Sequence, residues 1–304
     1  MAPKISTESR IEIRETRGMV NHGFQLAREL GISTLLVSAE LSSDRKRVDN
    51  VRDQESIIWV AQEEEATKEV CGAKDQCVEI PHGPVGPMDQ VSLALIIAVM
   101  NDYIQEDESV LCMLSVSGSD RLDNLLVVNP KRDFAWFATH ADGDESELPV
   151  SQEFVRLVVI ALKFASEGRE GKPIGTLFLL GDIEELEPIA RPLILNPCKG
   201  HPKKSRSIYD SGFLETMREF SALDGGFLID LNGIVEAAGV YLDAPVTRDV
   251  QVPHGLGSRH LAAAAATAKT NSLAIVISES SGAVTVFSRG AQVLSLRKPG
   301  PGGN

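Results

Sequence analysis

The sequence predicts an α/β protein of two domains, and three observations support this. The chain has 304 residues, about twice the usual domain length of roughly 150. Short apolar runs alternate with segments of helical periodicity, which is typical of an α/β sandwich with a mainly parallel sheet. Residues 141–149 are acidic and poor in apolar side chains, so they are the best candidate for a linker. We therefore expect domains at residues 1–145 and 150–304.

The first domain is expected to alternate helices and buried strands. Residues 8–30 carry apolar side chains at helical spacing and end at Gly31, a residue that commonly terminates helices. A second helix, rich in Leu, Ala, Ile and Val, is expected at residues 88–104. Short apolar runs predict buried strands at residues 34–38, 56–61, 109–116 and 124–128.

The second domain is expected to begin with an amphipathic helix at residues 151–166, closed by Gly168 and Gly171. Its apolar face consists of Phe154, Leu157, Val158, Ala161 and Phe164. Residues 174–181 are too apolar for a solvated face, which predicts a central strand in a mixed sheet.

The rest of this domain is expected to contain a helix at residues 211–223 and two hairpins. The first hairpin turns at Asn232-Gly233, a dipeptide typical of a type I′ turn. The second spans residues 273–287 and turns at Ser281-Gly282. Between them, a glycine-containing turn leads into a helix made almost entirely of alanine.

Composition and charge exclude several classes of protein. The chain is 43% hydrophobic and 24% charged, which is ordinary for a globular protein. No apolar run approaches the roughly 20 residues of a membrane span, and the first residues lack the apolar core of a signal peptide, so we expect a cytoplasmic protein without a membrane partner. A net charge of −13 argues against nucleic acid as a partner.

Cysteines are few and do not suggest a metal site. The spacing of Cys71 and Cys77 fits no usual zinc pattern. We therefore expect buried or idle thiols at these two positions and at Cys112 and Cys198.

Residues 255–260 have the pattern of a phosphate-binding turn. Gly255 and Gly257 permit a tight turn, Ser258 is a suitable N-cap, and the free N–H groups of the first helical turn would face an anion. Arg259 adds a guanidinium fork suited to phosphate oxygens.

A second source of positive charge is the basic loop, which follows Asn196-Pro197. Its basic residues are Lys199, His201, Lys203, Lys204 and Arg206. A solvated loop and a loop that folds over a phosphate ligand are equally compatible with this sequence.

Three further features are weak when taken alone. Asp224-Gly225-Gly226 lies between a predicted helix and a predicted strand, but Asp-Gly is a common turn dipeptide. Residues 278–282 form a hairpin turn that carries hydroxyl groups. His254 has no evident partner, which favours a structural or exposed side chain.

Taken together and in order, these motifs resemble the diadenylate cyclase domain. That family carries an Asp-Gly-Ala motif, a Gly-Thr-Arg-His-Arg-Ala motif that opens a helix, and a turn similar to Ser-Glu-Glu-Thr-Gly-Ala. The corresponding segments here are residues 224–226, 257–262 and 278–283. Residues 171–182 and 193–197 are similar to its opening strand and following segment, so the resemblance covers about residues 150–290.

The order of domains is similar to that of soluble archaeal-type cyclases. Their N-terminal α/β domain is similar to the C-terminal domain of pyruvate kinase, although the likeness over residues 1–145 is much weaker. This resemblance implies a role of the first domain in oligomerisation or regulation.

The resemblance implies an enzyme that makes cyclic di-AMP from two ATP molecules with Mn²⁺ or Mg²⁺. Asp224 would bind the metal and accept a proton, Arg259 would hold phosphate, and His260 would orient an oxygen. Glu279 would be a second metal ligand or a solvent-facing carboxylate. The remaining nucleotide-binding residues would be Gly225, Gly226, Leu242, Gly257, Ser258, Ser278 and Ser280.

Three departures from the family pattern occur in these motifs. Gly226 replaces alanine and Ser258 replaces threonine, both mild changes. Leu261 stands where many members have a second arginine, which removes a cation near the phosphates.

A product with two equivalent linkages favours two identical half-sites that face each other across a two-fold axis, so we expect self-association and allow for a higher oligomer. One rival interpretation is a non-catalytic regulator that binds ATP or a cyclic dinucleotide. Another is a scaffold whose glycine turns are only structural. Asp224 favours the enzyme, because phosphate binding alone would be easier without a carboxylate.

Overall fold

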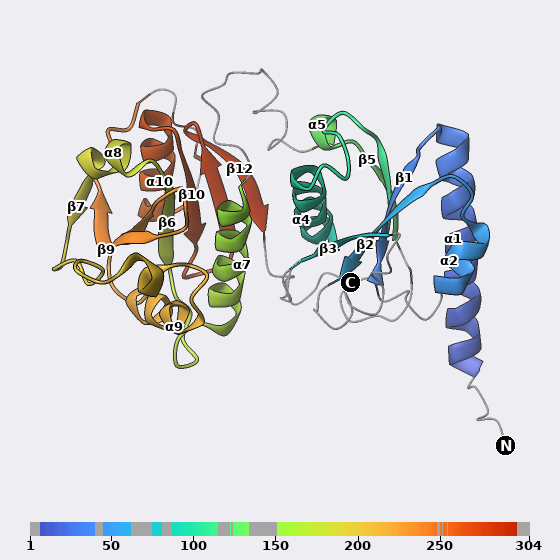
Figure 1. Cartoon of the computed structure of the whole chain (residues 1–304), viewed down its shortest axis with the longest axis horizontal. Helices are drawn as coiled ribbons and strands as arrows, with labels where there is room; N and C mark the ends of the chain where they lie inside the picture. Colours follow the sequence, from blue (N-terminus) through green and yellow to red (C-terminus); the bar gives the residue numbers. More distant parts are fainter. Residues whose placement is uncertain are drawn as a thin grey trace. The chain divides into compact units, whose positions relative to one another are not determined.

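The chain forms two compact units in a computed structural model, divided after Ala138 (Figure 1). The structure describes residues 7–39, 45–61, 75–80, 87–114, 122, 124–133, 151–247, 250, 252–253 and 255–296. The predicted linker at residues 141–149 lies outside them, as do Cys71 and His254. Both units combine helices with a sheet, which confirms the predicted α/β class.

The first unit is built on a five-stranded sheet of order β3-β2-β1-β4-β5. The first four strands in this order run parallel, and β5 pairs antiparallel with β4. The strands are β1 (Thr34–Ser38), β2 (Ser56–Ala61), β3 (Gln76–Glu79), β4 (Val110–Leu114) and β5 (Asn124–Val128). The prediction of a mainly parallel sheet is therefore confirmed.

Two helices of the first unit, α1 (Thr7–Leu30) and α4 (Pro87–Met100), agree with the sequence prediction within a few residues. Two shorter helices, α2 (Arg45–Val51) and α5 (Pro130–Asp133), were not predicted. Side chains of α1 and α2 such as Phe24 and Val48 pack with Leu35, Trp59 and Met113 of the sheet in one core cluster. β5 differs from its prediction as a buried strand, since it lies at the sheet edge and Val127 is 39% exposed.

One cysteine expectation is wrong. Cys77 on β3 is disulfide-bonded and is therefore not an idle thiol. Cys112 and Cys198 are buried free thiols, as expected. Burial raises the pKa of Cys112 to about 12, so this thiol stays protonated at neutral pH.

The second unit is built on a mixed seven-stranded sheet of order β12-β11-β10-β6-β8-β9-β7. The strands are β6 (Thr176–Gly181), β7 (Ala190–Pro192), β8 (Gly226–Ile229), β9 (Val235–Leu242), β10 (Ser272–Ile277), β11 (Val284–Ser288) and β12 (Ala291–Leu296). β6 is central and fully buried, and it pairs parallel with β8 and antiparallel with β10. The predicted central strand and mixed sheet are confirmed.

Helices cover both faces of this sheet (Figure 1). Leu177 and Leu179 of β6 pack with the alanines of α10 (Ser258–Lys269), whereas the alternate residue Phe178 contacts Phe164 of α7 (Gln152–Glu167) edge to face. The remaining helical segments are α8 (Ile183–Leu186), η2 (Glu187–Ile189), η3 (Lys203–Arg206) and α9 (Ser211–Phe220). The small alanine side chains let α10 lie close to the strands beneath it.

The first helix of this unit follows its predicted pattern. Ser151 caps α7 by accepting a hydrogen bond from the Phe154 N–H, and Gly168 ends it with a φ of +62°. All five predicted face residues are buried. In the part of the chain that the structure describes, no helix is long and apolar enough to cross a membrane.

The turn between β8 and β9 is not the predicted type I′ turn. Gly233 has a φ of +74°, but Asn232 does not have the positive φ that a type I′ turn requires at both central residues. Instead, Asp230 accepts hydrogen bonds from the N–H groups of Asn232 and Ile234 through its carboxylate. This side chain replaces the Asn-Gly pair as the organiser of the turn.

Candidate functional site

A cavity of about 670 Å³ lies at the N-terminus of α10. Seven of the predicted site residues line it, together with Lys172, Pro173 and Ile277. The seven are Gly257, Ser258, Arg259, His260, Ser278, Glu279 and Ser280. The turn before α10 and the hairpin turn after β10, which are about 20 residues apart in sequence, therefore meet at one site.

The start of α10 leaves its first amide groups open to the cavity. Gly257 is the N-cap residue and Ser258 is the first helical residue, so the expectation that Ser258 forms the cap is wrong. Within the described chain, no side chain caps these amides. Gly255 needs its glycine because its φ is +92°, whereas Gly257 has an ordinary φ of −79° and open space around its Cα. Free first-turn N–H groups are suited to an anion.

Arg259 lies between two carboxylates at this site. One terminal guanidinium nitrogen is 3.9 Å from Oδ1 of Asp224, and the other is 3.6 Å from Oε2 of Glu279. The side chain of Asp224 is 96% exposed, so its carboxylate is open to a further molecule. The three predicted charged residues thus come together, with the cation in the centre.

The two glycines after Asp224 are required by close backbone contacts. Gly225 has a φ of +104°, and a Cβ there would lie 2.7 Å from the carbonyl oxygen of Val240. A Cβ on Gly226 would lie 2.8 Å from the carbonyl oxygen of Leu177 on the paired strand β6. Gly226, which departs from the alanine of the family motif, is therefore needed for the observed spacing of β6 and β8.

His260 is buried at the wall of the cavity without a hydrogen-bond partner for either ring nitrogen among the described residues. Its ring packs edge to face on Phe287, with the ring centroids 6.1 Å apart. Burial, assisted by the charge of Arg259, lowers the pKa of His260. The imidazole is therefore neutral at pH 7 and has one donor nitrogen and one acceptor nitrogen, both of them buried.

The turn between β10 and β11 places hydroxyl groups at the cavity. The Ser278 N–H donates to the Ala283 carbonyl, and the Gly282 N–H donates to the Ser278 carbonyl. The hydroxyls of Ser278 and Ser280 are 3.3 Å apart. This compact turn fixes the backbone of Glu279 between them.

Asp224, Gly225 and Gly226 do not line the cavity, and Asp224 is joined to it through Arg259. Two further predicted features also lie away from it. Leu242 is 6% exposed and belongs to the core beneath α10. In the basic loop, Arg206 is buried and donates to the carbonyls of His201 and Val235 while it pairs with Glu236 at 2.6 Å. Arg206 is therefore neither solvated nor available to a phosphate ligand. It is a buried cation with a structural role.

Four residues of this site were not predicted from the sequence. Lys172, Pro173 and Ile277 line the cavity directly. Gly175 lies behind it, where an added Cβ would be 2.8 Å from Cβ of Glu279 and 2.9 Å from a terminal nitrogen of Arg259. A glycine at the start of an apolar strand can mark such a close approach, and this signal could have identified Gly175.

The donor set fits a metal that is shared with a ligand. Among the described residues, no group of three or more His, Cys, Asp or Glu side chains is arranged to hold a metal ion. Asp224 and Glu279 provide two carboxylates on either side of Arg259. This matches the usual binding of Mg²⁺ by one or two carboxylates together with phosphate oxygens.

Two protein-family models match the chain, each over a different region. Residues 163–292 match the family described as "DisA bacterial checkpoint controller nucleotide-binding". Residues 15–132 match the family described as "Probable sensor domain DacZ_P".

Two relatives of this chain are both named diadenylate cyclase. The relative from Methanocaldococcus jannaschii is 30% identical over 296 residues, which covers 90% of this chain and 93% of that protein. The relative from Haloferax volcanii is 38% identical over 138 residues, or 45% of this chain and 49% of that protein.

Among solved structures, a pyruvate kinase from Cryptosporidium parvum matches 42% of this chain and 23% of its own, with 12% identity and a TM-score of 0.32. The likeness of residues 1–145 to pyruvate kinase therefore stays a prediction.

The resemblance of the second domain to diadenylate cyclases is confirmed. The extent and identity of the match to the Methanocaldococcus relative show that the chain belongs to the diadenylate cyclase family, which consists of nucleotidyltransferase enzymes.

Proposed function

We propose that this protein condenses two ATP molecules into cyclic di-AMP and releases two pyrophosphates, at a site shared by two subunits. The observation that carries this proposal is that Arg259 and the open N-terminus of α10 line one cavity, with the exposed carboxylate of Asp224 3.9 Å from the Arg259 guanidinium. Anion-binding groups and an exposed carboxylate are the parts that phosphoryl transfer from a nucleotide requires.

Each half of the reaction forms one bond between a ribose 3′-oxygen and an α-phosphorus and breaks the bond from that phosphorus to the pyrophosphate oxygen. Arg259 and the first-turn amides of α10 hold phosphate oxygens. Asp224 accepts the proton of the attacking hydroxyl. Ser258, Ser278 and the neutral His260 orient oxygens through hydrogen bonds.

Asp224 would also hold a divalent cation, Mn²⁺ or Mg²⁺, with Glu279 as the second protein ligand. When bound, such an ion acidifies the hydroxyl and offsets charge on the phosphate. Glu279 serves as a ligand only when it leaves the guanidinium of Arg259, which lies 3.6 Å away. Binding of ATP supplies a replacement anion for Arg259 and thereby frees Glu279.

The exposure of Asp224 supports a site completed by a second subunit. Its side chain is 96% exposed, although a catalytic carboxylate usually works in a site from which water is excluded. A second chain with its own ATP, related by a two-fold axis, would close the site and provide the second reacting α-phosphate.

An exposed apolar surface lies beside Asp224, and we name it the apolar edge. It consists of Leu193, Ile194, Leu195 and Tyr241, which are 44%, 39%, 96% and 47% exposed. The Leu193 N–H donates to the carbonyl of Gly239, and a Cβ on Gly239 would contact both Ile194 and the carbonyl oxygen of Asp224. Exposed apolar groups next to the site favour contact with another protein surface, which we assign to a second copy of this chain.

The assay that tests the proposal is direct. We expect the purified protein, incubated with ATP and Mn²⁺ or Mg²⁺, to form cyclic di-AMP and pyrophosphate, with the product identified by mass spectrometry. Chelation of the metal by EDTA should stop the reaction. Binding of ATP without any product would support the alternative of a catalytically inactive regulator. A protein that neither binds nor converts ATP would overturn both interpretations.

Gly175 provides a sharper test of the cavity, because it changes geometry without changing charge. We expect Gly175→Ala to reduce the rate of cyclic di-AMP synthesis about a hundredfold, since the new Cβ displaces both Arg259 and Glu279 and a small misplacement of catalytic groups is costly. The rate is measured by product formation at saturating ATP. Gly18→Ala on α1, where the added Cβ meets open space, is the matched control and should keep the wild-type rate. Equal rates for both variants would remove Gly175 from the site.

A further inference from the structure

A smaller cavity of about 220 Å³ adjoins the main one. The two share Lys172, Pro173, Arg259 and Glu279 in their linings. The residues that line only the smaller cavity are Arg169, Glu170, Ile174, Gly175, Ser221 and Ala222. Lys172 and Arg259 are thus the cations that line both spaces.

The backbone of Lys172 is held in place by a tight turn. Arg169 and Lys172 exchange two backbone hydrogen bonds of 2.9 Å, and the residues between them, Glu170 and Gly171, have φ of 51° and 74°. Gly168 is needed at the start of this turn, because a Cβ there would lie 2.3 Å from the carbonyl oxygen of Lys172. Arg169 ties the turn to α9 through Glu219 at 2.8 Å. Lys172 therefore starts from a fixed position at the mouth of both cavities.

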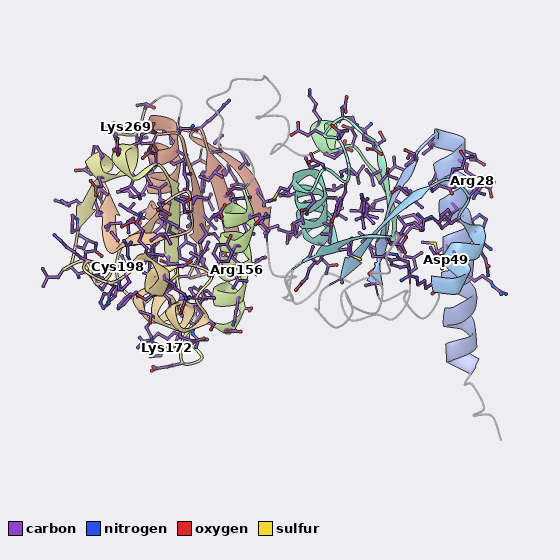
Figure 2. All side chains as sticks on the ribbon, viewed as in Figure 1. Arg28, Asp49, Arg156, Lys172, Cys198 and Lys269 are labelled. Atoms are coloured by element: carbon purple, nitrogen blue, oxygen red, sulfur yellow. The ribbon has the colours of Figure 1, made fainter. Side chains whose placement is uncertain are left out.

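Lys172 lies at the end of the second unit where α10 begins. Figure 2 shows it at the tip of the loop between α7 and β6, with Lys269 of the last turn of α10 at the opposite end of the unit. Its ammonium group can therefore approach an anion that is bound at the N-terminus of α10.

Lys172 has no carboxylate partner among the described residues, unlike the other cations of the two cavities. Arg259 lies between Asp224 and Glu279, and Arg169 pairs with Glu219. Within the described residues, no carboxylate lies within ion-pair distance of Lys172. A polyanion that enters the cavities would meet this lysine as an unpaired positive charge.

We infer that Lys172 binds the β- and γ-phosphates of ATP, and that the smaller cavity receives these terminal phosphates. The inference rests on the proposed cyclase reaction, in which Asp224 lies at the α-phosphate and the two terminal phosphates leave as pyrophosphate. Lys172 contacts the part of the substrate that ATP has and AMP lacks. It is therefore a substrate-binding residue that distinguishes a triphosphate from a monophosphate.

The test compares two nucleotides on three variants. Calorimetry with Mg²⁺ measures binding of α,β-methylene-ATP, which cannot release pyrophosphate, and of AMP. For Lys172→Gln we expect the Kd of α,β-methylene-ATP to rise about tenfold, while the Kd of AMP stays within about twofold. Lys172→Arg should retain most of the affinity. Lys269→Gln in the last turn of α10, which removes one exposed charge outside both cavities and at the opposite end of the unit, should bind both nucleotides as the wild type does (Figure 2).

The outcomes separate this inference from the proposed function. Unchanged binding of α,β-methylene-ATP by Lys172→Gln, or equal weakening for the two nucleotides, would overturn the role of Lys172. If the role of Lys172 is overturned but the wild-type protein makes cyclic di-AMP, the proposed cyclase function still holds. A wild-type protein that neither binds the analogue nor makes product overturns both.

Discussion

Asp224→Asn is expected to reduce cyclic di-AMP synthesis by a factor of about a thousand while ATP binding is retained. Loss of a proton acceptor in the transition state costs about 10² to 10⁴ in rate, and the metal would lose a ligand as well. In the absence of a divalent metal, ATP binding should be equal or tighter, because the variant removes a negative charge 3.9 Å from Arg259 at the phosphate site. Product formation at saturating ATP and a separate titration with α,β-methylene-ATP measure the two effects.

Asp243→Asn is the matched control for this experiment. Asp243 is exposed directly after β9, and among the described residues it is not within ion-pair distance of Arg259, as Asp224 is. The control makes the same change of one carboxylate to an amide and should keep the wild-type rate. Near-wild-type synthesis by Asp224→Asn would remove Asp224 from the chemistry, whereas loss of both rate and binding would indicate a disturbed fold.

Much of the fold follows from local sequence patterns. Apolar runs predicted β1, β2, β4 and β6 because these strands are buried on both faces, and helical spacing predicted α1 and α7. The pattern did not predict β3 or β7, which have four and three residues and lie at sheet edges. Such strands form because a neighbouring strand offers unpaired backbone groups, so their own residues carry little signal.

The candidate site could be predicted where its residues lie in recognisable motifs. The turns at Asp224, at Arg259 and at Ser278 meet as their order predicted. Lys172 could not be identified in this way, because a lysine in a loop looks solvated in sequence and its place at the site depends on how the turn before β6 packs. Gly175, at the start of an apolar strand, carried a signal of a close approach, but its neighbours Arg259 and Glu279 are known only from the structure.

The sequence left the basic loop open between a solvated loop and a phosphate contact, and the structure decides this only for Arg206. Five basic residues within eight positions suggest a phosphate contact, but the strongest cation among them, Arg206, is buried against Glu236 and two backbone carbonyls. A basic side chain that donates to buried carbonyl groups looks the same in sequence as one that binds a ligand. The two can be distinguished only when the positions of the carbonyl groups are known.

Leu195→Asp is expected to abolish synthesis by separating the two subunits, with ATP binding by each chain unchanged. Leu195 is 96% exposed in the apolar edge beside Asp224, so the change should not disturb the fold of the single chain. Loss of one buried leucine costs about 2 kcal/mol. In a two-fold dimer the contact of Leu195 is lost at two symmetric positions, so the loss of binding free energy doubles. The Kd of the dimer should therefore rise about a thousandfold. Sedimentation and product formation over a range of protein concentrations measure the effect, and high concentration should partly restore the rate.

Leu231→Asp tests whether this effect belongs to the apolar edge or to any exposed leucine. Leu231 is 45% exposed in the turn after β8, whereas Asp224 precedes that strand, so the two lie at opposite ends of it. The control should therefore keep both the assembly and the rate of the wild type. A fully active Leu195→Asp monomer would contradict the shared site, because one chain cannot then require a second α-phosphate from a partner. A dimeric but inactive Leu195→Asp variant would place the contact elsewhere and assign Leu195 to the site itself.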